Sequence, residues 1–545
     1  MRELRQRVSR VSPVQASLLL TAALLLLLQA WRSHYFLTDD NLVQYFPVLS
    51  ELGRNAAQGR WELSSAYLFG GQYPLGKDPL FQFCFHPLLR GLGLLAVTPL
   101  RFWIIDLFAS FQFLLTAGAF STLLMELRRR KKIHLSDRAA IFLTLSYTAA
   151  AYPLIVGPCW MIFLGPPAVL PVFFWGILHP QRSRGLLLIF AGQLHGYLSS
   201  QSGVYLFCLI FATLLAAGWC WIERAIEPLL RWGAAGLLAG AVLAPLWWSS
   251  MNAVVSSPRQ ISVALASLAS IPAPTFLASF FAGGLSHVLG QEFAIFELNT
   301  VHGYAMASCA AGGLALVAVL AKRRWIREDV LLLGLSFLVI LLVARPAWLG
   351  ELISRTPLLR ATRWPFRETF LFLFFIHLWL AFQPLALDRR WKRLVFFGGI
   401  LVFTLSLVGF GPPSFAPRKV ERRLLFSGEA FAYWEKLKMD AGPAAQWAVF
   451  ADGATLNRPF KPIPALLLGL NNYPALFEFK SLGGYTTTPL ASTLPPDHPS
   501  GAFSLDRKDE LVRRYPGLQT LTLLSDRPLT IEYPDGSVGM FDFKD

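Results

Sequence analysis

Long apolar runs constrain the fold of this chain more than any other feature. A bilayer core about 30 Å thick is crossed by roughly 20 apolar residues in a helix, and a soluble domain has no need of so many such runs. With 54% hydrophobic and 15% charged residues, the 545-residue chain has the composition of an α-helical polytopic membrane protein. The spans that we predict, about eleven, are 14–31, 103–125, 139–157, 159–178, 186–200, 203–221, 233–249, 304–321, 330–345, 368–387 and 394–411.

The segments between the apolar runs alternate in composition, and this alternation predicts the topology. Short basic segments such as 128–138 and 322–329 alternate with long ones rich in aromatic residues, Pro and Gly. Since basic loops stay in the cytoplasm, we expect a cytoplasmic N-terminus. Much of the net charge of +16 is then a topology signal, so no nucleic-acid partner is expected. The external segments are 32–102, 250–303, 346–367 and the residues after 411.

The C-terminal residues differ from the rest in composition. Short strand-like pieces recur there, Asp535-Gly536 is typical of a hairpin turn, and 427–439 has the pattern of an amphipathic helix. We therefore divide the chain into a transmembrane domain, 1–411, and a small external α/β or mostly β domain, 412–545.

Two adjacent carboxylates, Asp39 and Asp40, follow the first apolar run. A carboxylate beside a bilayer is costly unless it is solvated, paired or functional. One interpretation is helix capping, because a helix is predicted at 41–58 and carboxylates favour helix N-termini. Capping explains one carboxylate better than two, so a chemical role is the alternative.

The segment after this helix interleaves aromatic rings with hydrogen-bonding groups. Such a mixture suits a sugar, which has apolar faces and a rim of hydroxyl groups, and it also suits a membrane interface. The aromatic residues include Trp61, Tyr67, Phe69, Tyr73, Phe81, Phe83 and Phe85, and the polar ones are Gln72, Lys77, Asp78 and His86.

The order of motifs resembles a known family. Asp40-Asn-Leu-Val-Gln44-Tyr45-Phe-Pro47 is followed by Gly59-Arg60-Trp61 and by Gly70-Gly71-Gln-Tyr-Pro74. With an acidic pair after the first span, this order is similar to that of GT-C membrane glycosyltransferases, and within them to the YfhO-like branch. Two later stretches match that branch loosely, 195–207 and Arg363-Trp-Pro365-Phe-Arg367. The resemblance covers most of the membrane part and none of the residues after 411.

The resemblance implies a reaction and a GT-C-like fold. A sugar would move from a polyprenyl-phosphate donor to a cell-envelope glycan, lipid or protein acceptor, with inversion, outside a bacterial cytoplasmic membrane. Asp40 stands where the family's first-loop acidic residue falls and is the first catalytic candidate, with Asp39 second. The guanidinium groups of Arg363 and Arg367 suit the oxygens of the leaving phosphate, and Lys77 is a further phosphate ligand. The alternative for the arginines is contact with lipid headgroups.

The remaining candidates belong to substrate binding or to a metal. Asp39 and Asp40 have the residue type that favours Mg or Mn, whereas 250–303 shows no metal-ligand spacing. For the hairpin that holds His195 and Gln201, simple packing is the alternative. The predicted substrate-binding residues are Gln44, Tyr45, Trp61, Gln72, Tyr73, His86, His195, Gln201 and Glu292.

Two other functions stay open. A transporter or flippase of lipid-linked sugars typically has broken or charged spans and internal duplication, whereas here the polar residues gather in loops. A non-catalytic envelope-assembly protein would bind polymer through its C-terminal residues. Replacing Asp40 by Asn separates these functions, because it should abolish transfer and leave a scaffold intact.

Overall fold

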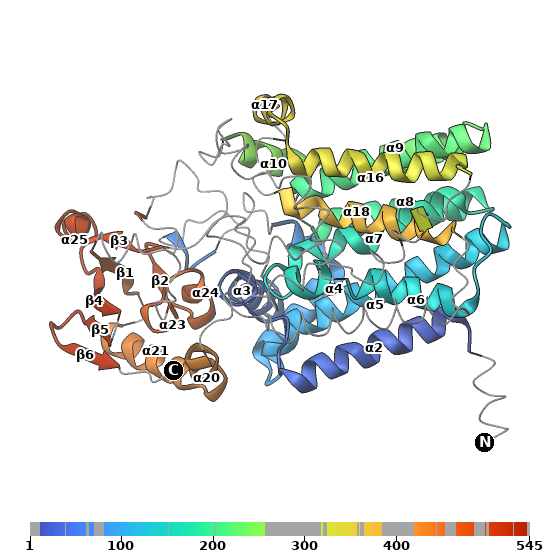
Figure 1. The fold of residues 1–545 in the computed structure, drawn as a ribbon. Helices are drawn as coiled ribbons and strands as arrows, with labels where there is room; N and C mark the ends of the chain where they lie inside the picture. The colour runs from blue at the N-terminus through green and yellow to red at the C-terminus, as the bar shows by residue number, and fades with distance from the viewer. Residues whose placement is uncertain are drawn as a thin grey trace, which may run out of the picture. The chain divides into compact units, whose positions relative to one another are not determined.

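The chain forms two compact units in a computed structural model (Figure 1). The helical unit joins Met1–Phe36, Leu107–Trp247 and Gln260–Pro413, and the mixed unit joins Leu37–Asp106, Trp248–Arg259 and Ser414–Asp545. The segment after the first apolar helix therefore shares a unit with the C-terminal residues. The described residues are 11–38, 40–60, 65–69, 81–150, 152–200, 202–256, 315, 318–319, 324–356, 359, 365–383, 419–442, 444–452, 465–483, 496–497, 501–526 and 528–541.

Several long apolar helices suggest a multi-pass membrane protein. Among the described residues, 5 helices are long and apolar enough to cross a membrane, and a bent pair with an angle of 78° makes 6 if it counts as one span. The bend falls at Arg345-Pro346, between α16 (Arg327–Ala344) and α17 (Ala347–Arg355). The 5 helices are Pro13–Trp31 (α2), Arg101–Arg129 (containing α5, Ile104–Arg129), Met161–Leu178 (containing α7, Gly165–Leu178), Gly203–Glu223 (in α9, Ser202–Glu223) and Glu227–Trp248 (in α10, Glu227–Ser256).

Three further predicted spans coincide with shorter helices. These are α6 (Asp137–Thr148), α8 (Arg182–Leu198) and α18 (Thr369–Ala381). Helix α6 ends before Pro153, which has no N–H to continue the ladder, and a π-helical turn, η7 (Tyr152–Val156), follows it. The predicted span 394–411 and nearly all of 304–321 lie outside the described residues, so the number eleven stays a prediction.

Small residues and one arginine hold neighbouring helices of this unit together. Helix α7 packs on α8, where a Cβ on Gly176 would lie 2.7 Å from Ile189 Cγ1. Small residues allow such close approach between membrane helices. Arg231 of α10 donates hydrogen bonds to the carbonyls of Gly176, Ile177 and His179, which lie at the C-terminal end of α7. The last carbonyls of a helix lack α-helical donors, so Arg231 helps to cap α7. The Gly176 carbonyl also accepts the N–H of His179 at 3.3 Å.

A mixed sheet of 6 strands organises the C-terminal part of the second unit. The central strand β1 pairs in parallel with β4 on one edge, and with β2 and β3 one after the other on the opposite edge. β4, β5 and β6 continue the sheet antiparallel, and β5 and β6 form the predicted hairpin, with Gly536 at φ 79° in its turn. The strands are β1 (Gln446–Ala451), β2 (Lys480–Ser481), β3 (Phe503–Ser504), β4 (Gln519–Asp526), β5 (Leu529–Glu532) and β6 (Val538–Phe541).

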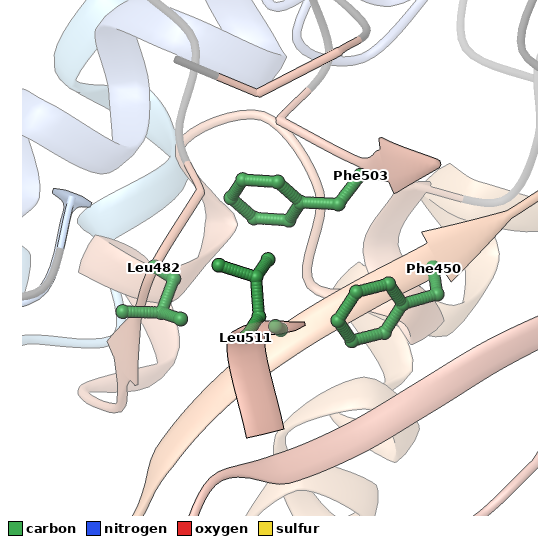
Figure 2. Close-up of a cluster of buried hydrophobic side chains, with 5 residues drawn as sticks. Phe450, Leu482, Phe503 and Leu511 are labelled. Atoms are coloured by element: carbon green, nitrogen blue, oxygen red, sulfur yellow. The ribbon is translucent and has the colours of Figure 1, made fainter. Parts of the chain in front are cut away.

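Strand β1 is buried on both faces, which is typical of a central parallel strand. On one face, Ala448 and Phe450 form a core with Leu482, Phe503 and Leu511 (Figure 2). Leu511 comes from α25 (Lys508–Arg514), the helix in the crossover from β3 to β4.

The other face of β1 meets a second helix. Trp447 packs edge-on against Trp434 of α21 (Glu429–Ala441), and the Trp434 ring stacks on Phe479 at 4.0 Å between ring centroids. Helix α21 confirms the predicted amphipathic helix. Helices on both faces explain why β1 lacks the alternating pattern of a half-exposed strand.

Candidate functional site

The predicted Asp-Gln-Tyr-Pro motif forms a π-helical turn in the mixed unit. The turn η1 (Asn41–Tyr45) runs directly into α3 (Phe46–Ala57). Pro47 has no N–H, so the carbonyl of Val43, four residues earlier, loses its α-helical donor. The backbone N–H of Asn472, far along the chain, donates to this carbonyl at 3.1 Å. A single π turn inside a helix is frequent at functional sites, and here proline is a physical cause of it.

Asp40 lies directly before this turn, but its side chain does not cap it. Its backbone is helical, with φ −58° and ψ −29°, and its side chain makes no capping hydrogen bond. The residue is partly buried. The capping interpretation therefore does not account for Asp40. Asp39 lies outside the described residues.

Gln44 and Tyr45 are buried in the same turn. Gln44 is 1% exposed, and neither its amide nitrogen nor its amide oxygen has a hydrogen-bond partner among the described residues. An unpaired buried amide costs about 1–3 kcal/mol, so such groups call for an explanation. A ligand that supplies a donor and an acceptor, such as a sugar, would satisfy both atoms. Tyr45 is 2% exposed and packs in the core.

Glu51, which the sequence analysis passed over, is a buried carboxylate on α3. It is 1% exposed and accepts hydrogen bonds from Ser65 Oγ at 2.7 Å and from the N–H of Ala66 at 2.9 Å. These bonds fix the turn that begins at Ser65. From the sequence, a glutamate on an amphipathic helix is expected to be exposed. The sequence therefore gives no sign that Glu51 is buried and accepts these hydrogen bonds.

The segment that follows Ser65 extends the sheet beyond β2. The N–H of Ser481 donates to Tyr67 O at 2.7 Å, and the N–H of Phe69 donates to Gly483 O at 3.2 Å. Residues 65–69 are thus joined by backbone hydrogen bonds to the end of the C-terminal sheet.

Arg54 makes a second link between α3 and the C-terminal residues. Its guanidinium donates to the carbonyl of Ala475 and forms an ion pair with Glu478 at 3.1 Å. Ala475 belongs to α24 (Tyr473–Phe477), which packs against α3. The α24 segment therefore holds both α3 and, through Asn472, the turn that precedes it.

His86 has a structural partner. Its Nδ1 accepts a hydrogen bond from the N–H of Leu89 at 3.3 Å, which caps α4 (Pro87–Gly93). Burial lowers the pKa of His86 to about 4, so the ring is neutral near pH 7. Neutrality leaves Nδ1 free to accept, since a protonated ring has two donors.

Arg367 belongs to the helical unit, next to a buried carboxylate. It lies in the 3₁₀ turn η9 (Pro365–Glu368), and its guanidinium carbon lies 5.1 Å from the ring centroid of Phe163. Its carbonyl accepts a hydrogen bond from Tyr152 Oη at 2.9 Å. Glu368 interacts electrostatically with Arg367 and with Arg345, a residue that the sequence analysis did not single out. A charged residue at the edge of an apolar run, as Glu368 is, is the signal that would have found this cluster.

His195 pairs with another polar side chain between helices of the same unit. Its Nε2 lies 3.0 Å from Gln112 Oε1, which joins α8 to α5. Such a pair fits the packing alternative as well as a ligand site.

Several predicted residues lie outside the described residues, so their roles stay predictions. A divalent ion at Asp39 and Asp40 belongs with them, and the part of the chain that the structure describes holds no group of three or more His, Cys, Asp or Glu suited to a metal. The residues are Asp39, Trp61, Gln72, Tyr73, Lys77, Gln201, Glu292 and Arg363.

Comparison of the chain with protein-family models, with curated proteins and with solved structures gives no match. The site must therefore be judged on its residues and geometry.

Proposed function

We propose that the chain is a GT-C-like membrane glycosyltransferase with about eleven spans, a cytoplasmic N-terminus and an external mixed unit. It would transfer a sugar from a polyprenyl-phosphate donor to a cell-envelope acceptor. The observation that carries the proposal is the π turn, where Asp40 is not used as a cap and Gln44 is a buried, unsatisfied amide. The predicted membrane spans would surround the hydrocarbon chain of the lipid donor.

The proposed reaction assigns one task to each group. Asp40 accepts the proton of the acceptor hydroxyl, whose oxygen then forms a bond to the anomeric carbon. The bond between that carbon and the phosphate oxygen breaks, and the polyprenyl phosphate leaves with the electron pair. Arg367, with Arg363 as predicted, neutralises the charge on the phosphate. Gln44 orients a sugar hydroxyl.

A transporter of lipid-linked sugars is the second candidate, and a specific observation favours it. The helix pair α16 and α17 is broken by 78°, and Arg345 at the break is 3% exposed. Broken helices and buried charges are features of substrate sites in transporters.

Donor turnover separates the two candidates. Purified full-length protein in nanodiscs is given radiolabelled polyprenyl-phosphate sugars and cell-envelope extract, and label in polymer is counted. A transferase moves label to polymer, and the Asp40→Asn variant does not. Proteoliposomes loaded with the same donors test transport, since a transporter changes the side of the label without releasing the sugar from its lipid.

A further inference from the structure

Two apolar helices of the helical unit end in basic residues at positions where glycine is usual. Helices α5 and α9 are long and apolar enough to cross a membrane. In the turn that ends each helix, an N–H donates to the carbonyl five residues earlier, at 3.0 Å for Lys132 and at 3.2 Å for Ala225. The left-handed residues of these turns are Lys131, with φ 56°, and Arg224, with φ 53°. Glycine adopts this conformation without strain, so the two basic side chains are kept at a conformational cost.

Ion pairs bring these two helix ends together. Oε1 of Glu223, the last residue of α9, lies 3.9 Å from Arg130 Nη1 and 3.7 Å from Lys132 Nζ. Lys131 lies between these two cations in the chain, and Arg224 directly follows their common carboxylate. Both are exposed, and neither side chain has an ion-pair or hydrogen-bond partner among the described residues. The two turns therefore present unpaired cations at one end of the unit.

The N-terminal end of α16 adds to this charge. The guanidinium of Arg327 donates to the carbonyl of Trp221 at 3.4 Å, and its carbon lies 5.4 Å from the centroid of the Trp221 ring. Arg324, three residues earlier, is exposed and unpaired among the residues that the structure describes. We call these helix ends the basic rim, which consists of 126–137, 223–224 and 324–329 and holds eight Lys or Arg against five Asp or Glu. The carboxylates of the basic rim cannot balance its positive charge.

Exposed apolar side chains border the basic rim. Trp221, Trp325 and Ile226 are at least half exposed. Tryptophan is enriched at membrane–water interfaces, where its ring lies at the level of the lipid head groups. Farther along α16, Val330 and Phe337 are also exposed, on a helix that continues into an apolar run. A positive rim that adjoins an apolar surface is complementary to a molecule with an anionic head and hydrocarbon tails.

We propose that the basic rim binds an anionic phospholipid of the surrounding bilayer. Lys131, Arg224 and Arg324 donate hydrogen bonds to the phosphate oxygens, and the acyl chains follow the exposed apolar residues of α9 and α16. A zwitterionic lipid carries an amine whose positive charge the rim repels, so the rim selects the anionic lipid. The sequence analysis predicts this end of the helices to be cytoplasmic. The site is independent of the proposed sugar transfer.

Equilibrium binding of two lipids to full-length protein in detergent micelles tests this site. Radiolabelled phosphatidylglycerol and phosphatidylcholine with the same acyl chains are compared. Wild type should bind phosphatidylglycerol saturably and more tightly by roughly tenfold or more. Lys131→Gln combined with Arg224→Gln removes two cations and should abolish most of this preference. Glycine at the same two positions should abolish it equally while raising thermal stability, because glycine relieves the left-handed backbone.

A second pair of substitutions controls for net charge. Arg184→Gln combined with Arg423→Gln removes two exposed arginines, on α8 and on α20 (Lys419–Ser427), and should leave the preference unchanged. Equal affinity of wild type for the two lipids, or an equal loss of preference in the control pair, would overturn the site. Displacement of the lipid by sodium phosphate, but not by sodium chloride at the same ionic strength, would assign the rim to a soluble phosphate and overturn the lipid.

Discussion

Replacing Gly469 by Ala tests the packing that places Asn472 near the π turn. Gly469 has φ 64°, and an added Cβ would lie 2.5 Å from Phe479 Cζ and 2.8 Å from Trp434 Cζ2. The left-handed conformation costs an alanine about 1–2 kcal/mol. Overpacking against two stacked rings adds about 1–3 kcal/mol, so we expect a total loss of about 2–5 kcal/mol.

Gly517 provides a matched control for this substitution. It also has a left-handed backbone, with φ 81°, but an added Cβ would meet nothing within 4 Å. Gly517→Ala should therefore lose only the conformational part, about 1–2 kcal/mol. Hydrogen–deuterium exchange of the β1 amides in full-length protein measures both losses, since about 1.4 kcal/mol corresponds to a tenfold change in exchange. Equal losses in the two variants would refute the packing described around Gly469.

Two further predictions concern the mixed unit. Arg54→Ala removes a charged hydrogen bond to the Ala475 carbonyl and an ion pair with a half-exposed Glu478, so it should destabilise the unit by about 2–4 kcal/mol. Glu478→Gln removes only the ion pair and should cost under about 1 kcal/mol; the same exchange measurement checks both, and equal losses would contradict the role of the carbonyl. Because the folded-state pKa of His86 is about 4, below its ordinary 6.5, the folded form binds fewer protons, and stability should fall by up to about 3 kcal/mol as pH drops from 6.5 to 4. His86→Asn keeps a capping acceptor without a titrating ring and should flatten this part of the pH–stability curve; an unchanged curve would contradict the neutral cap.

Local pattern predicted most of the elements that the structure describes. Hydropathy located the long spans, such as α2 and α9. An apolar run that is long enough to cross a bilayer as a helix has few alternative structures. A short strand-like run located β1, and turn chemistry at Asp535-Gly536 located the β5–β6 hairpin. The two-residue strands β2 and β3 were missed, since they are too short to carry a period.

Non-local contacts set the limit of the sequence analysis. Nothing in the residues around Val43 indicates that the N–H of Asn472 replaces the donor that Pro47 lacks. The motif was visible in the sequence, whereas the physical reason for its proline needed the fold. Likewise, the residues next to Arg345 in the sequence do not indicate a charged neighbour. Only the fold brings its charge near Glu368.

Sugar transfer by wild type and by an Asp40→Asn variant is the decisive test of the proposed transferase. The variant keeps the shape of the side chain and removes the proton acceptor, so transfer should fall by roughly 100-fold or more while the protein stays folded. Asp40→Glu should restore part of it. Transfer by Asp40→Asn at the wild-type rate, in nanodiscs with a lipid-linked sugar that the wild type uses, would show that Asp40 is not the proton acceptor.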